Sequence, residues 1–238
     1  MAMKFTLLCV ASALTSWVAF GDALETEPAV AAAPAGVYVE ARDATVWGGA
    51  CHISSEAVSG GRRAALGWAF SAGNHGGVDL AGTHVVAVLE GTHNLQGSQV
   101  FGTEEVPEIR SHVWVDAPNA RARDAAVAYV RSSVDLGTLV ASSDASVQVS
   151  LVADVFTMEV EGHLAVKGMA IADRSCCTMQ ESRWYSPLFE LQESVVGNPS
   201  ECRFEGVTGS LERWAFEGSN SVFVARLEGA EDSSAGTQ

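Results

Sequence analysis

The sequence has little positive charge. Its 238 residues include 14 Lys and Arg against 29 Asp and Glu, which gives a formal net charge of −15 at pH 7. Proteins that bind a phosphate backbone need clustered Lys and Arg, because these residues release counterions from the nucleic acid. We therefore expect no nucleic-acid partner and no attraction to an anionic membrane surface.

The chain also lacks the short motifs of several enzyme classes. It contains no G-x-S-x-G nucleophile elbow, no H-x-H or H-E-x-x-H spacing, and no Walker or dinucleotide-binding glycine pattern. These absences argue against α/β-hydrolases, zincin proteases and enzymes with a nucleotide cofactor. We accordingly favour a non-catalytic protein.

The N-terminus has the features of an export signal. Lys4 precedes a short apolar stretch, and the small residues Ala19 and Gly21 offer a cleavage site before Asp22. The apolar stretch falls short of the roughly 20 residues that span a bilayer, and no other stretch is long and apolar enough. We predict that residues 1–21 are a cleaved signal peptide and that the mature protein, periplasmic or extracellular, has no contact with the membrane.

Cysteine is scarce, and its distribution is uneven. The chain has 5 cysteines, of which Cys9 would leave with the signal peptide, so that four would remain. An even number in an exported protein makes disulfides the default expectation, with three possible pairings. The remaining cysteines are Cys51, Cys176, Cys177 and Cys202.

Alternating apolar and polar residues predict a β-rich domain. It follows an Ala/Pro/Glu-rich stretch over 22–35, which we expect to be a disordered linker. The polar residues 229–238 are expected to form a disordered tail. The predicted strands lie near 37–40, 66–70, 85–89, 112–115, 140–171, 211–216 and 222–227.

One helix is expected after Pro118, with Asp116 or Asn119 as its N-cap. Its apolar stripe consists of Ala122, Ala126, Val127 and Val130, and Gly137 marks a stop soon afterwards. The predicted fold class is therefore α+β and β-rich. We expect a single domain over 36–228 that forms an antiparallel sandwich or a partly closed barrel with one prominent helix.

Five short segments together resemble a bacterial domain-of-unknown-function family, number 1326. They are Tyr38 to Arg42, Thr45 to Cys51, Gly77 to Gly82, Ser175 to Cys177 with Trp184-Tyr185, and Asn220 to Val224. The resemblance covers about residues 36–228 and implies a shared fold, but it implies little about function. Members of the wider family often have a denser cysteine cluster near the first motif, where this chain has Ala44 and Thr45.

The strongest candidate site is a set of soft or borderline ligands in two distant segments. Thiolate, thioether and imidazole groups suit Cu(I) or Zn(II), so an exported protein with these groups could bind copper or zinc. The alternatives are a disulfide from Cys51 to Cys176 or Cys177, and a bridge that breaks and reforms in thiol redox exchange. The candidate metal ligands are Cys51, His52, Cys176, Cys177 and Met179.

Two other functions are compatible with the sequence. The first is a structural or small-molecule-binding β domain that disulfides stabilise. The second is an enzyme that uses Asp79 and His75 in a pocket, although an Asp that caps the turn after Gly76-Gly77 is the simpler explanation. We also predict that Cys51 lies close to the Cys176-Cys177 pair, while Cys202 is separate or pairs with the remaining thiol. The sequence does not identify a protein partner.

Overall fold

Most of the alternating segments form one large, curled and almost entirely antiparallel sheet. The structure, a computed structural model, describes residues 32–48, 61–96, 106–171 and 182–229. The strands are β1 (Ala35–Arg42), β2 (Trp47–Gly48), β3 (Arg63–Ala72), β4 (Asn74–His75), β5 (Val78–Asp79), β6 (Thr83–Gly91), β7 (Ile109–Asp116), β8 (Thr138–Asp144), β9 (Val147–Val152), β10 (Val155–Val160), β11 (Leu164–Ala170), β12 (Ser182–Arg183), β13 (Val195–Phe204), β14 (Trp214–Ala215) and β15 (Val222–Leu227).

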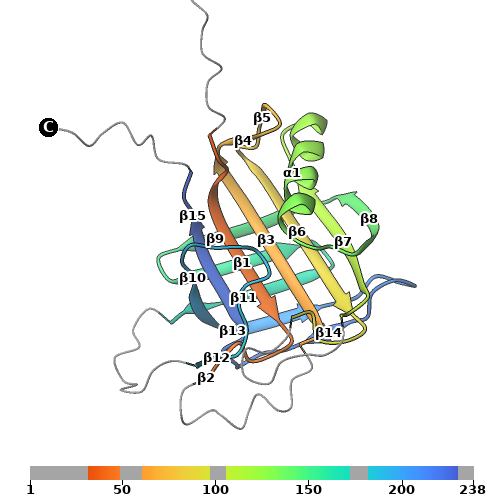
Figure 1. Ribbon diagram of the computed structural model, residues 1–238, viewed down its shortest axis with the longest axis vertical. Coiled ribbons are helices and arrows are strands. Elements are labelled where there is room, and N and C mark those ends of the chain that lie inside the picture. Colours follow the sequence, from red (N-terminus) through yellow and green to blue (C-terminus); the bar gives the residue numbers. More distant parts are fainter. Residues whose placement is uncertain (1–31, 49–60, 97–105, 172–181, 230–238) are drawn as a thin grey trace, which may run out of the picture. The chain divides into compact units, whose positions relative to one another are not determined.

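The large sheet is built from one continuous series of paired strands. It runs β8-β7-β6-β3-β1-β15-β13-β11-β10-β9, with β14 paired to β13, and two short pairs, β12-β2 and β4-β5, lie outside it. The sheet bends into a half-barrel, so that β9 and β10 cross behind β1 and β3 (Figure 1). The predicted β-rich α+β class is confirmed, and the partly closed barrel describes it better than a flat sandwich.

The central strands β1, β3, β6 and β7 are covered on both faces. One face packs against β9, β10, β11 and β13 through residues such as Val39, Val86 and Met158. The other face packs against α1 and a later segment through Leu66, Trp68 and other residues. Because both faces are buried, β6 is apolar along its whole middle, as predicted for a doubly covered strand.

A glycine sets the distance between the two halves of the sheet. A Cβ added at Gly67 on β3 would lie 2.6 Å from Met158 Sδ on β10, which is closer than carbon and sulfur can approach. The absence of a side chain at Gly67 therefore lets β10 pass close to the middle of β3.

The predicted helix is present as α1 (Ala120–Ser133), and its cap is Asn119. Asn119 Oδ1 accepts a hydrogen bond from Ala122 N (2.9 Å), which satisfies one of the free amides of the first turn. Ala122, Ala126 and Val130 are buried against the sheet. The helix connects β7 to β8, the one parallel pair among the described strands, because parallel neighbours need a long crossover between them.

The structure differs from the sequence prediction in one missed strand, one shortened strand and the residue at which order begins. The ten-residue strand β13 was missed, because Gly197 and Pro199 interrupt its alternation. The strand predicted over 211–216 is reduced to Trp214–Ala215. Order begins before Gly36, since Ala32 O already accepts a hydrogen bond from Asn74 N.

The predicted signal peptide, residues 1–21, and most of the predicted linker and tail lie outside the described residues. In the part of the chain that the structure describes, no helix combines the length and the apolar character that crossing a membrane requires.

Candidate functional site

The two segments that carry the predicted ligands are attached to one short antiparallel pair. In the pair β2-β12, Gly48 lies opposite Ser182 and Trp47 opposite Arg183. Trp184 N extends the pairing with a hydrogen bond to Val46 O (3.0 Å). Cys51, His52, Cys176, Cys177 and Met179 themselves lie outside the described residues, in the segments 49–60 and 172–181. The described chain therefore brings the start of one segment beside the end of the other.

A buried polar cluster lies beside this pair, at the end of β1. Tyr38, Glu40 and Arg42 alternate along the strand, so they project from the same face, and each is fully buried. Glu40 accepts hydrogen bonds from the Tyr38 hydroxyl (2.5 Å) and from Arg42 Nη1 (3.1 Å). The Arg42 guanidinium also lies over the ring of Tyr185, 5.3 Å from its centre.

The cluster combines one negative and one positive side chain in a fully buried position. Burial, reinforced by the neighbouring Glu40 charge, raises the pKa of Tyr38 well above its ordinary value, so the phenol stays protonated and acts as a donor. Removing either member of the buried Glu40–Arg42 pair would leave the other charge uncompensated. The Nε and Nη2 atoms of Arg42 have no hydrogen-bond partner among the described residues.

The cluster holds the segment that follows the second cysteine stretch. Leu188 N donates to Glu40 Oε2 (2.8 Å), and Tyr185 OH accepts from Asn94 Nδ2 (2.8 Å). Ser186 N donates to Gln96 Oε1 (3.1 Å), so the loop after β6 also contributes. These contacts fix the chain from Tyr185 to Leu188 against β1, immediately after β12.

Cys202 behaves as a core residue. It lies on β13 opposite Val166, is fully buried, and is a free thiol. Burial raises the pKa of Cys202 to about 12, so the reactive thiolate is scarce at neutral pH. Cys202 is therefore separate from any disulfide, which was one of the two outcomes expected for it. The four cysteines outside the predicted signal peptide thus do not form two disulfides.

Asp79 and His75 have structural roles. Asp79 Oδ1 accepts a hydrogen bond from Ala81 N (2.9 Å), which confirms the predicted turn cap. His75 lies in the two-residue strand β4, opposite Val78, and its ring meets that of Tyr129 edge-on at 5.5 Å. The pair thus borders a hairpin next to α1, and neither residue lines the cavity described next.

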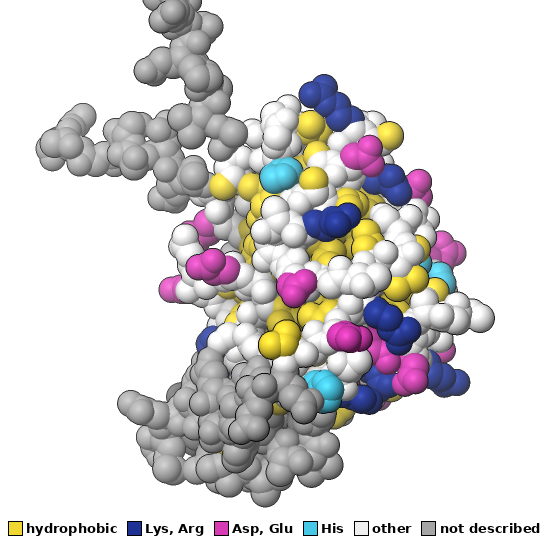
Figure 2. Space-filling model, turned by 45° about the vertical axis from the view of Figure 1, so that its right-hand side comes forward, with side chains coloured by type: hydrophobic (Ala, Val, Ile, Leu, Met, Phe, Trp, Pro, Cys, Tyr) yellow, Lys and Arg dark blue, Asp and Glu magenta, His cyan; other side chains and the backbone are white. Residues whose placement is uncertain are grey.

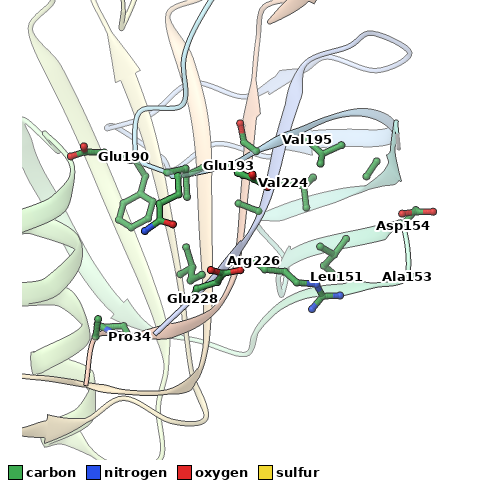
Figure 3. Close-up of a pocket in the computed structure, with 18 of the residues that line it drawn as sticks. Pro34, Leu151, Ala153, Asp154, Glu190, Glu193, Val195, Val224, Arg226 and Glu228 are labelled. Atoms are coloured by element: carbon green, nitrogen blue, oxygen red, sulfur yellow. The ribbon is translucent and has the colours of Figure 1, made fainter. Parts of the chain in front are cut away.

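A cavity that no sequence motif predicted lies at the other end of β1. Its volume is about 740 Å³, and its lining comes from both faces of the sheet, with Tyr129 and Phe189 on one side and Leu151 and Ala153 on the other. Figure 3 shows Arg226 extending from β15 toward Leu151 and Ala153. We call this cavity the β15 groove. Its other lining residues include Pro34, Asp154, Glu190, Glu193, Val195, Val224, Leu227 and Glu228.

Positive and negative side chains are mixed on the face of the molecule drawn in Figure 2. On the face drawn in Figure 2, Lys and Arg side chains are interspersed with Asp and Glu side chains and do not gather into a patch of one sign. That face has no extended basic surface of the kind that polyanions require.

Comparison with family models, with curated proteins and with solved structures finds no match for this chain. The candidate function is therefore argued from the site alone.

Proposed function

We propose that this is an exported protein whose two cysteine segments form one thiol site, which binds a soft metal such as Cu(I) or undergoes thiol–disulfide exchange. The observation that carries the proposal is the pairing of β2 with β12. It gives both segments a common base, although they are more than a hundred residues apart in the sequence.

Chain length supports a meeting of the two segments. Cys51 follows Gly48 by three residues, and Cys177 precedes Ser182 by five. At no more than about 3.6 Å per residue, the first distance is limited to about 11 Å and the second to about 18 Å. Both thiols are thus within reach of one place above the β2-β12 pair, where a disulfide or a shared metal ion would need them.

The free thiol of Cys202 supports the proposal independently. Without it, the mature chain keeps an odd number of cysteines, Cys51, Cys176 and Cys177. Adjacent cysteines bridge each other poorly, because the peptide between them would leave its preferred trans geometry. A single disulfide from Cys51 would leave one thiol in the segment of Met179, and reduction would provide three thiolates. If the cysteines served only to stabilise the fold through disulfides, the third, unpaired thiol would have no structural role.

The resemblance to family number 1326 is part of the same proposal. Residues of three of its segments, Thr45 to Cys51, Trp184-Tyr185 and Asn220 to Val224, meet around the base of the cysteine segments. Ala44, Val46, Trp184 and Tyr185 pack with Phe223 in one buried cluster. A motif set that converges on one place is consistent with a shared architecture, and the family's lack of an established activity leaves the function to experiment.

A competition titration with Cu(I) tests the metal form of the proposal. Reduced mature protein and a Cys176→Ser/Cys177→Ser variant compete with a chromophoric Cu(I) chelator. Cys202→Ala serves as the matched control, because it removes a thiol that is buried in the core. We expect the wild-type protein and the control to bind one Cu(I), and the double variant to bind it about tenfold more weakly or worse. Equal, weak binding by all three proteins would leave the cysteines without a metal-binding role.

A further inference from the structure

Within the described residues, the last part of β15 is paired on one side only, and it lines the β15 groove. β15 pairs with β1 from Val222 to Leu227, but β13 accompanies it only from Val222 to Val224. Within the described residues, Ala225, Arg226 and Leu227 thus have a strand on one side only. Lining residues from both faces of the sheet surround this edge. The backbone groups that face the groove are available to pair with an added strand.

An exposed apolar patch lies at the end of the β9-β10 hairpin, on the outer face of these strands. Val152, Val155 and Met169 are 72%, 51% and 60% exposed, respectively, which is unusual for large apolar side chains. Val155 lies opposite Val152 on β9 and opposite Met169 on β11, so that the three side chains project from one face of the sheet. Ala153, Asp154 and Ala170, their neighbours in the chain, line the groove. Because side chains alternate along a strand, this patch projects from the face opposite to Leu151 and Ala170, so it lies outside the groove lining.

The rim of the groove is acidic, and its charged side chains form no ion pairs among the described residues. Four carboxylates and one guanidinium line it, and none of the five side chains forms an ion pair with another described residue. In Figure 3, Glu190 lies toward α1 and Asp154 at the tip of the β9-β10 hairpin, so the carboxylates flank the edge on both sides. The charged lining residues are Asp154, Glu190, Glu193, Arg226 and Glu228.

Charge argues against the occupants that the chain itself could supply. Residues 22–31 contain Asp22, Glu25 and Glu27 but no Lys or Arg, and residues 230–238 contain Glu231 and Asp232 but no Lys or Arg. A second copy of the protein carries the same net charge of −15. Each would bring negative charge to a negative rim, which disfavours association.

We propose that the β15 groove binds an extended segment of another polypeptide in which apolar and basic residues alternate. The segment pairs with Ala225–Leu227 as an added strand. Its apolar side chains contact the floor formed by Leu151, Val195 and neighbouring residues, while its Lys or Arg side chains reach the rim carboxylates. Backbone pairing supplies affinity, and the alternation of side chains supplies specificity.

Three acetylated and amidated hexapeptides test the proposal on the mature protein. The first is Val-Lys repeated three times, the second has Glu in place of Lys, and the third is the Val-Lys peptide with methylated backbone nitrogens. Binding is measured by calorimetry, and the exchange of the Ala225–Leu227 amides is followed by NMR. The protein variants are Glu190→Gln/Glu193→Gln and a control pair of exposed residues remote from the groove, Glu161→Gln/Glu217→Gln.

We expect only the unmodified Val-Lys peptide to bind and to slow the exchange of groove-facing amides. The groove variant should bind it about fivefold more weakly, as expected for two exposed charge contacts, and the control pair should bind it like the wild type. The proposal is overturned if the peptide fails to bind at millimolar concentration, or if the methylated peptide binds equally well. It is also overturned if both variants lose affinity equally, or if the free protein already dimerises through the groove or protects these amides.

Discussion

The two ends of β1 differ in the burial of the charged side chains that lie there. At the Arg42 end, Tyr38, Glu40 and Arg42 are fully buried and bonded to one another and to Leu188 N. At the Gly36 end, where Val37 pairs with Arg226 of β15, the guanidinium is exposed and forms no ion pair within the described residues. One strand thus connects a closed polar cluster with an open, charged groove.

This difference separates the two roles that charge plays in the protein. A buried charge is costly without a partner of opposite charge, so the Glu40–Arg42 pair and its contacts to Tyr185 and Leu188 fix the segments around the β2-β12 pair. Exposed charges that are unpaired contribute little to folding and remain available for a partner. The thiol site is therefore proposed above the rigid end of β1, and peptide docking at its open end.

The largest expected effect follows from breaking the buried pair. Arg42→Met leaves Glu40 buried without its cation and should lower the free energy of unfolding by about 3–5 kcal/mol. Arg226→Met, the matched change at the open end, should alter it by no more than about 0.5 kcal/mol. Urea denaturation of the mature proteins measures both values. Similar losses in the two variants would erase the distinction between the two ends of the strand.

A smaller, pH-dependent effect is expected from His84, which lies in the same row of the sheet as Arg226. Its Nδ1 accepts a hydrogen bond from Val149 N (3.1 Å), which requires a neutral ring and ties β6 to β9. Burial lowers the pKa of His84, and the opposing effect of Asp116 is weaker. The unfolded state therefore binds the proton more readily than the folded state. Stability should be complete above the unfolded pKa of about 6.5 and should fall as the pH decreases below it.

His84→Gln isolates this contribution. Glutamine retains an oxygen that can accept from Val149 N but does not titrate, so unfolding stability should depend less steeply on pH between 5 and 7 than in the wild type. His112, whose pKa is also lowered by burial, is present in both proteins and cancels in the comparison. Parallel pH profiles from urea denaturation would show that the β6-β9 contact does not depend on the protonation of His84.

The smallest effect is expected at the rim of the groove. Glu190→Gln/Glu193→Gln removes two exposed carboxylates that no described residue pairs with, so the free energy of unfolding should change by less than about 0.5 kcal/mol. Any change should be stabilising, because the net charge is negative, and it should shrink in high salt. A large loss of stability would mean that these carboxylates belong to the folded core and are not free for a partner.

Local pattern predicted the elements that depend on local physics. The continuous apolar run around Val85–Leu89 marked a doubly buried strand, and Asn119 with the stripe from Ala122 to Val130 marked the helix. The strand β13 escaped notice because Gly197 and Pro199 obscure its period. A bulge in its pairing with β11 lies at the same place, between Lys167 and Gly168.

The sites depended on contacts that sequence cannot show. Clustered cysteines were the basis for proposing a thiol site, but the pairing of Gly48 with Ser182 arises from the fold of the whole chain. The burial of Cys202 was hidden for the same reason, since a cysteine in a core strand looks like one in a disulfide. The β15 groove exists because β13 leaves β15 after Val224, and no local signal marks the point where two strands part.

The proximity of the two cysteine segments is the central claim, and thiol mapping by mass spectrometry tests it most directly. Mature protein is reduced, exposed to a mild oxidant at low concentration, and then alkylated before and after unfolding. If the two segments lie together, a disulfide should form rapidly within the molecule from Cys51 to Cys176 or Cys177. The remaining thiol of that pair should be alkylated in the native protein, and Cys202 only after unfolding. A Cys51 that stays a free thiol, or a disulfide that includes Cys202, would contradict it.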